Sequence, residues 1–262
     1  MLENTIDNIA HSNRLRHVNP KLKVTFAISL LLICVFSNSI IVPLIIALIM
    51  ISLTIFKAKV PLKIYLPLIG TPVGFGILTV VLMAIIYSGV GDKLFSIGIF
   101  GYNIYFHEYG VNMGLLVFSR MLGGVASTLF LVLTTPMTEL FYVLKELRVP
   151  SSILDIAMMM YRYIFVLLDE TIRIENAQKT RLGYKDLKTT YKSLGILAAN
   201  LFITSWDRGE RLFTTMNSRG YNGNLKLLSK IESPKIKYIL LILVFDILLI
   251  ILLYLTKDFK VF

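Results

Sequence analysis

The chain has 262 residues, of which 56% are hydrophobic and 16% charged, and its mean hydropathy is +0.73. Soluble domains contain about 45–50% apolar and about 25% charged residues, so this composition excludes a water-soluble globule, a disordered chain and a collagen-like fibre. The net charge is nevertheless +11, from 27 Lys and Arg against 16 Asp and Glu, and a membrane protein this basic must concentrate its positive charge in particular segments.

The N-terminal segment, residues 1–23, is polar, and the first apolar stretch begins only at Val24. A cleavable signal has a short basic start that is followed quickly by an apolar core. We therefore expect no secretory signal peptide here, and we interpret residues 1–23 as a polar segment outside the membrane.

Residues 24–135 contain the first group of predicted transmembrane helices. Val24–Phe36 and Ile40–Phe56 are together too long for one straight span of about 20 residues, so they predict a helical hairpin with its turn at Asn38. Ile64–Tyr87 and Val111–Thr135 are each long enough to cross the bilayer alone.

Residues 136–235 are less apolar and more charged. Their two apolar stretches, Ile153–Leu168 and Leu194–Thr204, are short and flanked by charge, which favours helices at the membrane interface over full spans. A last clear crossing, Ile236–Leu255, dominates the C-terminal segment 236–262.

The distribution of positive charge predicts the orientation in the plasma membrane. Sixteen of the 27 Lys and Arg lie in residues 136–237, and further groups lie in the N-terminal segment and in the 57–63 linker. The 88–110 loop holds one lysine, and the two lysines of the C-terminal tail are outweighed. Because basic loops stay in the cytoplasm, the N-terminus and residues 136–235 are predicted to be cytoplasmic. The expected fold is an all-α integral membrane protein, a transmembrane helix bundle with long cytoplasmic helices.

Two long helical seams run through the cytoplasmic region, with the alternating steps of four and three residues that are typical of helices packed against another helix. The first seam consists of Ile153, Ala157, Met160, Ile164, Leu167, Thr171, Ile174 and Gln178. The second consists of Ala198, Phe202, Ser205, Gly209, Leu212 and Met216.

Both seams end alike. An arginine, Arg181 or Arg219, follows the last seam position by three residues, and a glycine and a tyrosine come soon after it. Glycine just past a helix is the usual C-cap, so Gly183 and Gly220 are predicted to end the two helices. An arginine in the last turn also suits the negative end of the helix dipole, but capping alone does not explain the repetition. A rigid, permanently charged guanidinium is well suited to dock into an acidic or carbonyl-lined groove of a partner.

With these residues the chain resembles the transmembrane T subunit of energy-coupling-factor (ECF) transporters, specifically the cobalt-type CbiQ family, over nearly its whole length. The matching segments are Asn13-Arg14-Leu15-Arg16-His17-Val18-Asn19-Pro20-Lys21, Thr134-Thr135-Pro136 with Glu139-Leu140, Leu147-Arg148-Val149-Pro150, Tyr161-Arg162-Tyr163-Ile164 and Met216-x-Ser218-Arg219-Gly220-Tyr221. The last segment and the Tyr-Arg-Tyr segment are the most specific.

The resemblance implies a coupling function. In that family two x-Arg-x tips insert into a pair of ABC-type ATPases, and the coupling helices tilt a separate substrate-binding membrane subunit. The corresponding ATPase-coupling tips here are Thr180-Arg181-Leu182 and Ser218-Arg219-Gly220; the first departs from the commoner Ala-Arg-Gly or Ala-Arg-Ser form. The implied cargo is cobalt, with nickel or a vitamin as the alternative, and a small accessory membrane subunit is a further implied partner.

The sequence predicts neither an enzyme nor a metal site. It contains no G-x-x-x-x-G-K-[ST] phosphate loop, so ATP must be bound by another polypeptide, and we expect no cofactor. The histidines and the cysteine fall in segments that cannot converge, whereas transition metals favour clustered imidazole or thiolate ligands. These residues are His11, His17, His107 and Cys34.

Two charges fall within predicted spans, Arg120 and Asp246. Charges inside the membrane are costly and usually face protein, so we predict that these two pair with each other; a proton or ion relay is the alternative.

Three rival functions receive less support from the sequence. A stand-alone secondary transporter needs internal repeats and broken helices at the membrane midplane, and no inverted repeat is visible. A membrane enzyme needs a concentrated acid–base or metal constellation, and the sequence shows none. Nucleic-acid binding is disfavoured because the basic residues lie beside membrane spans, where they serve orientation and contact with the lipid bilayer.

Overall fold

The computed structural model describes residues 2–86, 93–99, 102–222 and 234–256. They belong to two compact units, one made of Met1–Val143 with Ile231–Phe262 and the other of Leu144–Lys230. The helices of the first unit are α1 (Leu2–Ser12), the 3₁₀ turn η1 (Arg14–His17), α2 (Pro20–Phe36), α3 (Ile41–Ser52), the π-helical turn η2 (Leu53–Lys57), α4 (Leu62–Ile86), α5 (Glu108–Thr134), α6 (Met137–Glu146), which runs into the second unit, and α9 (Ile236–Leu255).

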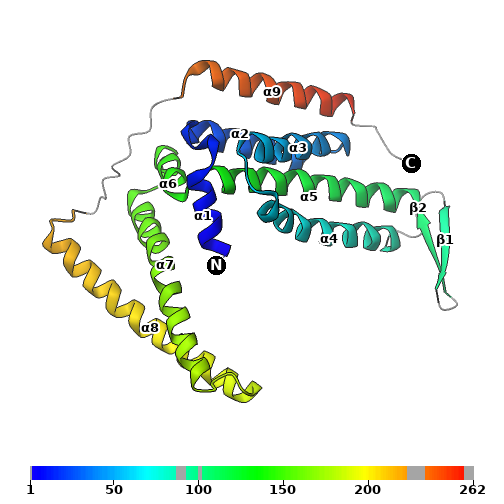
Figure 1. Ribbon diagram of the computed structural model, residues 1–262. Coiled ribbons are helices and arrows are strands. Elements are labelled where there is room, and N and C mark those ends of the chain that lie inside the picture. Colours follow the sequence, from blue (N-terminus) through cyan, green and yellow to red (C-terminus); the bar gives the residue numbers. More distant parts are fainter. Residues whose placement is uncertain (1, 87–92, 100–101, 223–233, 257–262) are drawn as a thin grey trace. The chain divides into compact units, whose positions relative to one another are not determined.

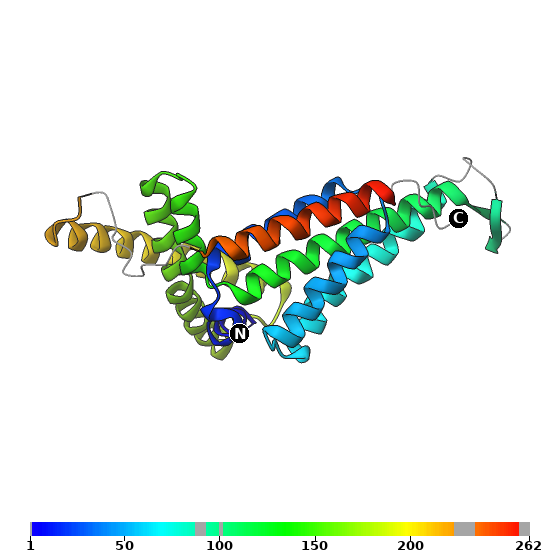
Figure 2. The same cartoon turned by 90° about the horizontal axis from the view of Figure 1, so that it is seen from above.

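Helix α5 is the centre of the first unit. Helices α2, α3 and α4 all pack along it, and both views show α5 running between them (Figures 1 and 2). The predicted hairpin is present as α2 and α3, but each arm packs more extensively against α5 than against the other arm. Both arms of the hairpin therefore pack mainly against α5.

Small residues on α5 allow this close packing. A Cβ added at Gly114 would lie 3.0 Å from the Cα of Val80 in α4. A Cβ added at Gly123 would lie 2.5 Å from the Sγ of Cys34 in α2 and 2.9 Å from the carbonyl oxygen of Pro43 in α3. Because lipid provides little hydrophobic drive between helices, membrane bundles depend on small residues that let backbones approach, and α5 follows this rule on two faces.

The C-terminal end of α5 is closed by the N-terminal segment. The Nδ2 of Asn13 donates to the carbonyl oxygen of Leu133 (3.2 Å), and the Nζ of Lys23 donates to that of Thr134 (2.8 Å). Lys23 is 3% exposed, and its Nζ also lies 3.7 Å from Oε2 of Glu139 in α6. The last carbonyls of a helix have no intrahelical partner, so Asn13 and Lys23 act as the cap of the central helix.

The all-α membrane fold predicted from the sequence is confirmed. Among the described residues, α4, α5, α7 (Ser151–Thr180) and α9 are long and apolar enough to cross a membrane. The sequence favoured an interfacial position for Ile153–Leu168, but in the structure this stretch belongs to a helix of 30 residues. Within the predicted 88–110 loop, β1 (Lys93–Ile99) and β2 (Tyr102–His107) form a short antiparallel hairpin.

The second unit is built on an antiparallel pair, α7 and α8 (Leu187–Ser218), which meet at their connecting loop and spread apart toward their other ends (Figure 1). Few side chains on either helix are buried. Met160 and Phe202, one from each predicted seam, are 62% and 67% exposed. The seams therefore form long helices as predicted, but the described part of the chain leaves these seam positions uncovered.

The role of α5 can be tested with two adjacent glycines. Replacing Gly123 with Ala forces a Cβ against the hairpin arms, and overpacking of this kind costs about 1–3 kcal/mol. Gly124→Ala is the matched control, because a Cβ there meets nothing within 4 Å and alanine is the better helix former. Thermal unfolding in detergent should show a lower Tm for Gly123→Ala only; equal Tm values would contradict the close packing.

Candidate functional site

The first predicted tip is the C-terminus of α7. Thr180 is its last residue, and Arg181 occupies the C-cap position. The amide of Leu182 donates to the carbonyl of Lys179 (3.1 Å), and the amide of Gly183 donates to that of Gln178 (2.8 Å). These two hydrogen bonds form the Schellman motif, which satisfies carbonyls at a helix C-terminus that have no partner within the helix.

The second tip, at the C-terminus of α8, has the same construction. Ser218 is the last helical residue and Arg219 the C-cap. The amide of Gly220 donates to the carbonyl of Asn217 (3.0 Å), and the amide of Tyr221 donates to that of Met216 (3.0 Å). Arg181 and Arg219 therefore occupy the same position of the same motif.

The residues before the two arginines also correspond. Both carry hydroxyls that are bonded back to their own helix: the Oγ1 of Thr180 donates to the carbonyl of Ala177 (2.9 Å), and the Oγ of Ser218 donates to that of Thr214 (2.9 Å). The repetition seen in the sequence is thus a repetition of backbone geometry, with a hydroxyl bonded to the preceding turn in each tip.

The two tips differ in the residue that takes the left-handed position. The left-handed position of the second tip is Gly220, with φ +75°, as expected, but in the first tip it is Leu182, with φ +57°, and Gly183 is the residue after it. A left-handed residue other than glycine costs about 1–2 kcal/mol. Gly183 serves close packing instead, since a Cβ there would lie 2.7 Å from Ser193 Oγ and 2.9 Å from the Gln178 carbonyl.

Both arginines face solvent. Arg181 and Arg219 are exposed, and neither makes an ion pair with another described residue. Leu182, which follows the first arginine, is 68% exposed. Each tip thus presents, at the negative end of a helix dipole, a guanidinium without an ion pair among the described residues, on a backbone that the Schellman bonds cap.

Side chains brace the first tip against α8. The Nε2 of Gln178 donates to the carbonyl of Ser193 (2.9 Å), and the Oγ of Ser193 donates to the carbonyl of Gly183 (2.7 Å). The hydroxyl of Tyr184 completes the network by donating to Oε1 of Gln178 (2.7 Å). The loop that carries Arg181 is therefore fixed to both helices of the pair.

Two longer-range contacts hold the helices farther along. The Nη2 of Arg208 lies 2.9 Å from Oε2 of Glu170. At the wide end, the hydroxyl of Tyr221 donates to Oδ2 of Asp155 (3.3 Å), which is 2% exposed. Burial, with the Asp155 carboxylate beside it, raises the pKa of Tyr221, so its hydroxyl stays protonated as a donor at neutral pH. The second tip is thus tied to the start of α7.

The sequence alone does not reveal this last contact. Tyr221 was visible in the repeated endings, but its partner lies 66 positions away. The available signal was Asp155 itself, the acidic residue inside the mainly apolar stretch Ile153–Leu168.

The predicted pair of intramembrane charges is not formed. The Nε of Arg120 donates to the carbonyl of Ser37 (2.6 Å), and its Nη2 donates to Oδ1 of Asn38 (3.0 Å). The arginine on α5 thus caps the α2–α3 turn, where backbone carbonyls need donors. Asp246 lies on α9 with its Oδ1 buried and without a hydrogen-bond partner in the described ranges.

The candidate metal ligands lie apart. His11 lies 3.7 Å from Asp7 one turn earlier in α1, and Cys34 is buried where α2 meets α5. Across the part of the chain that the structure describes, three or more His, Cys, Asp or Glu side chains nowhere gather as a metal site would require.

The chain is similar to proteins of cobalt and energy-coupling factor transport. Residues 11–231 match the cobalt transport protein family CbiQ. An uncharacterized protein of Methanocaldococcus jannaschii is 58% identical over 99% of this chain and 96% of its own length. A putative fused cobalt transport protein CbiMQ of Methanocorpusculum labreanum is 39% identical over 86% of this chain and 38% of its own. The energy-coupling factor transporter transmembrane protein EcfT of Streptococcus equi is 27% identical over 80% of each.

The Tyr221 contact predicts a local effect on the second tip. Tyr221→Phe removes only the hydroxyl and leaves the buried Asp155 with one hydrogen bond fewer, a loss worth about 1–3 kcal/mol. Hydrogen exchange of the amides of Arg219, Gly220 and Tyr221 should become faster. Tyr191→Phe is the control, because Tyr191 is 76% exposed on the same helix. If both variants exchange at the wild-type rate, the contact does not hold the tip.

Arg120 predicts a second, independent result. Arg120 donates its hydrogen bonds to the α2–α3 turn, so Arg120→Leu should lower the free energy of unfolding. The effect of Asp246→Asn on that free energy should be independent of Arg120. In a double-mutant cycle the two effects should add within about 0.5 kcal/mol. A coupling energy clearly above that limit would indicate that Arg120 and Asp246 interact, and would contradict the absence of the ion pair.

Proposed function

This chain belongs to the cobalt transport protein family CbiQ, and from that membership we propose that it is the non-catalytic transmembrane coupling subunit of an ATP-driven ECF-type importer for cobalt ions. In this assembly two ABC-type ATPase subunits hydrolyse ATP, a separate membrane subunit binds the cargo, and a small accessory membrane subunit is a further partner.

The observation that carries the proposal is the pair of matched tips. Arg181 and Arg219 occupy equivalent C-cap positions, are exposed and are unpaired among the described residues. Two copies of one contact surface fit two copies of one partner, as a paired ATPase would supply. A guanidinium on a fixed backbone binds carboxylate or carbonyl oxygens with little further loss of entropy.

The bracing of the tips supports a mechanical role. A force applied to Arg181 is passed to α8 through Gln178 and Ser193, and a force applied to Arg219 is passed to α7 through Tyr221 and Asp155. Movement of either ATPase would therefore move both helices rather than bend a loose loop.

The exposed apolar side chains of α7 and α8 support the proposal of a separate membrane partner. Large apolar side chains on α7 and α8 remain uncovered, among them Met160, Phe202 and Trp206. Contiguous exposed apolar surface marks an interaction site or contact with lipid. In our proposal the substrate-binding subunit covers this surface and tilts when the helices move.

The orientation follows from the proposed partners. ATPases work in the cytoplasm, so the tips and the N-terminal segment face the cytoplasm in this arrangement, and the β1–β2 hairpin lies on the opposite side. The sixteen basic residues between positions 136 and 237 agree with this orientation.

The coupling role predicts the effect of charge reversal at both tips. Arg181→Glu with Arg219→Glu should abolish co-purification of the ATPase chains in detergent, because a carboxylate cannot replace a guanidinium among acidic or carbonyl oxygens. Each single variant should retain part of the ATPase, since the other tip remains.

Arg211→Glu is the matched control: it changes the same charge on an exposed position of α8, two turns before the tip. It should co-purify the ATPases as the wild type does. Undiminished ATPase binding by the double variant would refute the assignment, provided that the variant inserts into the membrane at wild-type levels.

A further inference from the structure

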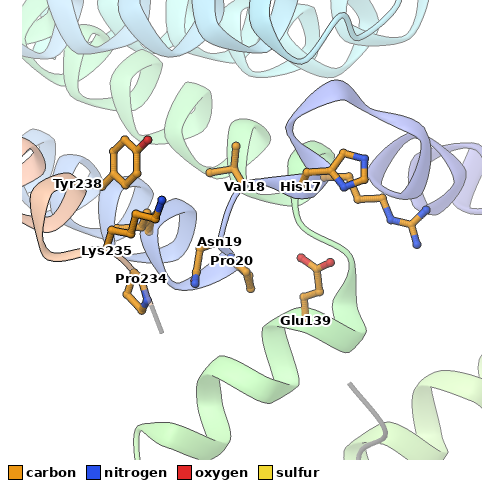
Figure 3. Close-up of a pocket in the computed structure, with 10 residues that line it drawn as sticks. His17, Val18, Asn19, Pro20, Glu139, Pro234, Lys235 and Tyr238 are labelled. Atoms are coloured by element: carbon orange, nitrogen blue, oxygen red, sulfur yellow. The ribbon is translucent and has the colours of Figure 1, made fainter. Parts of the chain in front are cut away.

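A polar cavity lies in the first unit at the end where α2 and α9 begin. Its volume is about 580 Å³, and the residues around its rim include Arg16, His17, Glu139 and Lys235. Figure 3 shows Pro234, Lys235 and Tyr238 entering from the α9 side, His17, Val18 and Asn19 from the chain before α2, and Glu139 from α6.

The charge of the cavity is positive. Glu139 is the acidic residue of its lining, and this carboxylate is already balanced by the buried Lys23 Nζ at 3.7 Å. Arg16 donates to a backbone carbonyl, that of His11, at 3.1 Å. Neither Arg16 nor Lys235 forms an ion pair within the described ranges, so both cations are available to an anion.

An apolar groove of about 280 Å³ adjoins the polar cavity. The two share Val18, Leu22 and Tyr238 as lining residues, so they lie next to each other. The rest of the groove is mainly apolar, from Leu15, Phe26, Leu53, Phe130, Leu241 and Ile242. Of its two lysines, Lys23 turns its amine to the Thr134 carbonyl, and Lys57 is exposed.

We propose that this composite site binds one anionic phospholipid, with the phosphate headgroup in the polar cavity between Arg16 and Lys235 and an acyl chain in the adjoining groove. A cationic recess next to an apolar channel matches the two halves of such a molecule, and basic residues beside a membrane helix recognise anionic headgroups. A free phosphate would use only the first half of the site.

The bound lipid bridges two elements. The cavity and groove are lined both by residues before and in α2 and by Lys235, Tyr238, Leu241 and Ile242 of the α9 segment. Because α9 is mostly exposed along its length, with Leu249 its buried residue, a lipid at this place adds contacts between α9 and the bundle. This inference is independent of the coupling function.

Native mass spectrometry of the detergent-solubilised full chain tests the site. With added phosphatidylglycerol, the wild type should retain one lipid, and with phosphatidylcholine at the same concentration it should retain much less. Arg16→Glu with Lys235→Glu should lower the phosphatidylglycerol-bound fraction at least about tenfold, since each basic contact contributes to headgroup affinity. Lys237→Glu, an equal charge change on an exposed residue outside the cavity, should bind as the wild type does.

A second variant leaves the charge unchanged. Val18→Trp fills the junction of cavity and groove and should also abolish lipid retention, while the Tm of the lipid-free protein stays within a few degrees of wild type. Equal retention of both lipids by the wild type, or unchanged retention by both variants, would overturn the proposal. Displacement of phosphatidylglycerol by inorganic phosphate at millimolar concentration would likewise overturn it and leave a phosphate site without a lipid.

Discussion

The packing of α2, α3 and α4 onto α5 is the constraint on which the membrane unit depends. Gly114 and Gly123 bring the neighbouring backbones so close that no other side chain fits without displacement. Arg120 then fixes the α2–α3 turn, and Asn13 and Lys23 close the C-terminal end of α5. These donors satisfy carbonyls that a bilayer would leave unpaired, which is why polar residues from distant parts of the sequence converge on one helix.

The helix pair α7–α8 is stabilised by a different kind of contact. It buries little apolar surface, so polar contacts rather than a core hold it together: Gln178 with Ser193 at the loop, Glu170 with Arg208 along the pair, and Asp155 with Tyr221 at the wide end. A pair held by a few specific bonds keeps its geometry while its apolar faces remain free for partners. A helix pair of this kind is consistent with the coupling function that we propose for a member of the CbiQ family.

The sequence predicted what depends on local pattern. Ile236–Leu255 has the predicted bounds, the hairpin turn falls at Asn38, and the repeated arginines mark two helix ends of one design. It did not predict contacts between distant residues, such as Asp155 with Tyr221, or the partner of Arg120, because the choice of partner depends on how the hairpin packs against α5. The left-handed residue follows the C-cap arginine in both tips, so it is Gly220 in the second tip but Leu182 in the first, where the glycine stands one position later.

In the coupling function that we propose, the two matched tips contact ATPase subunits. A photo-crosslinking residue at Thr180 and, separately, at Ser218 tests it most directly, since these equivalent positions each precede a C-cap arginine. In native membranes both positions should trap the same ATPase polypeptides, whereas a crosslinker at the exposed Tyr191 on α8 serves as the comparison position. Crosslinks from both tips to lipid or to this chain alone, with ATPase present in the same membranes, would contradict the account.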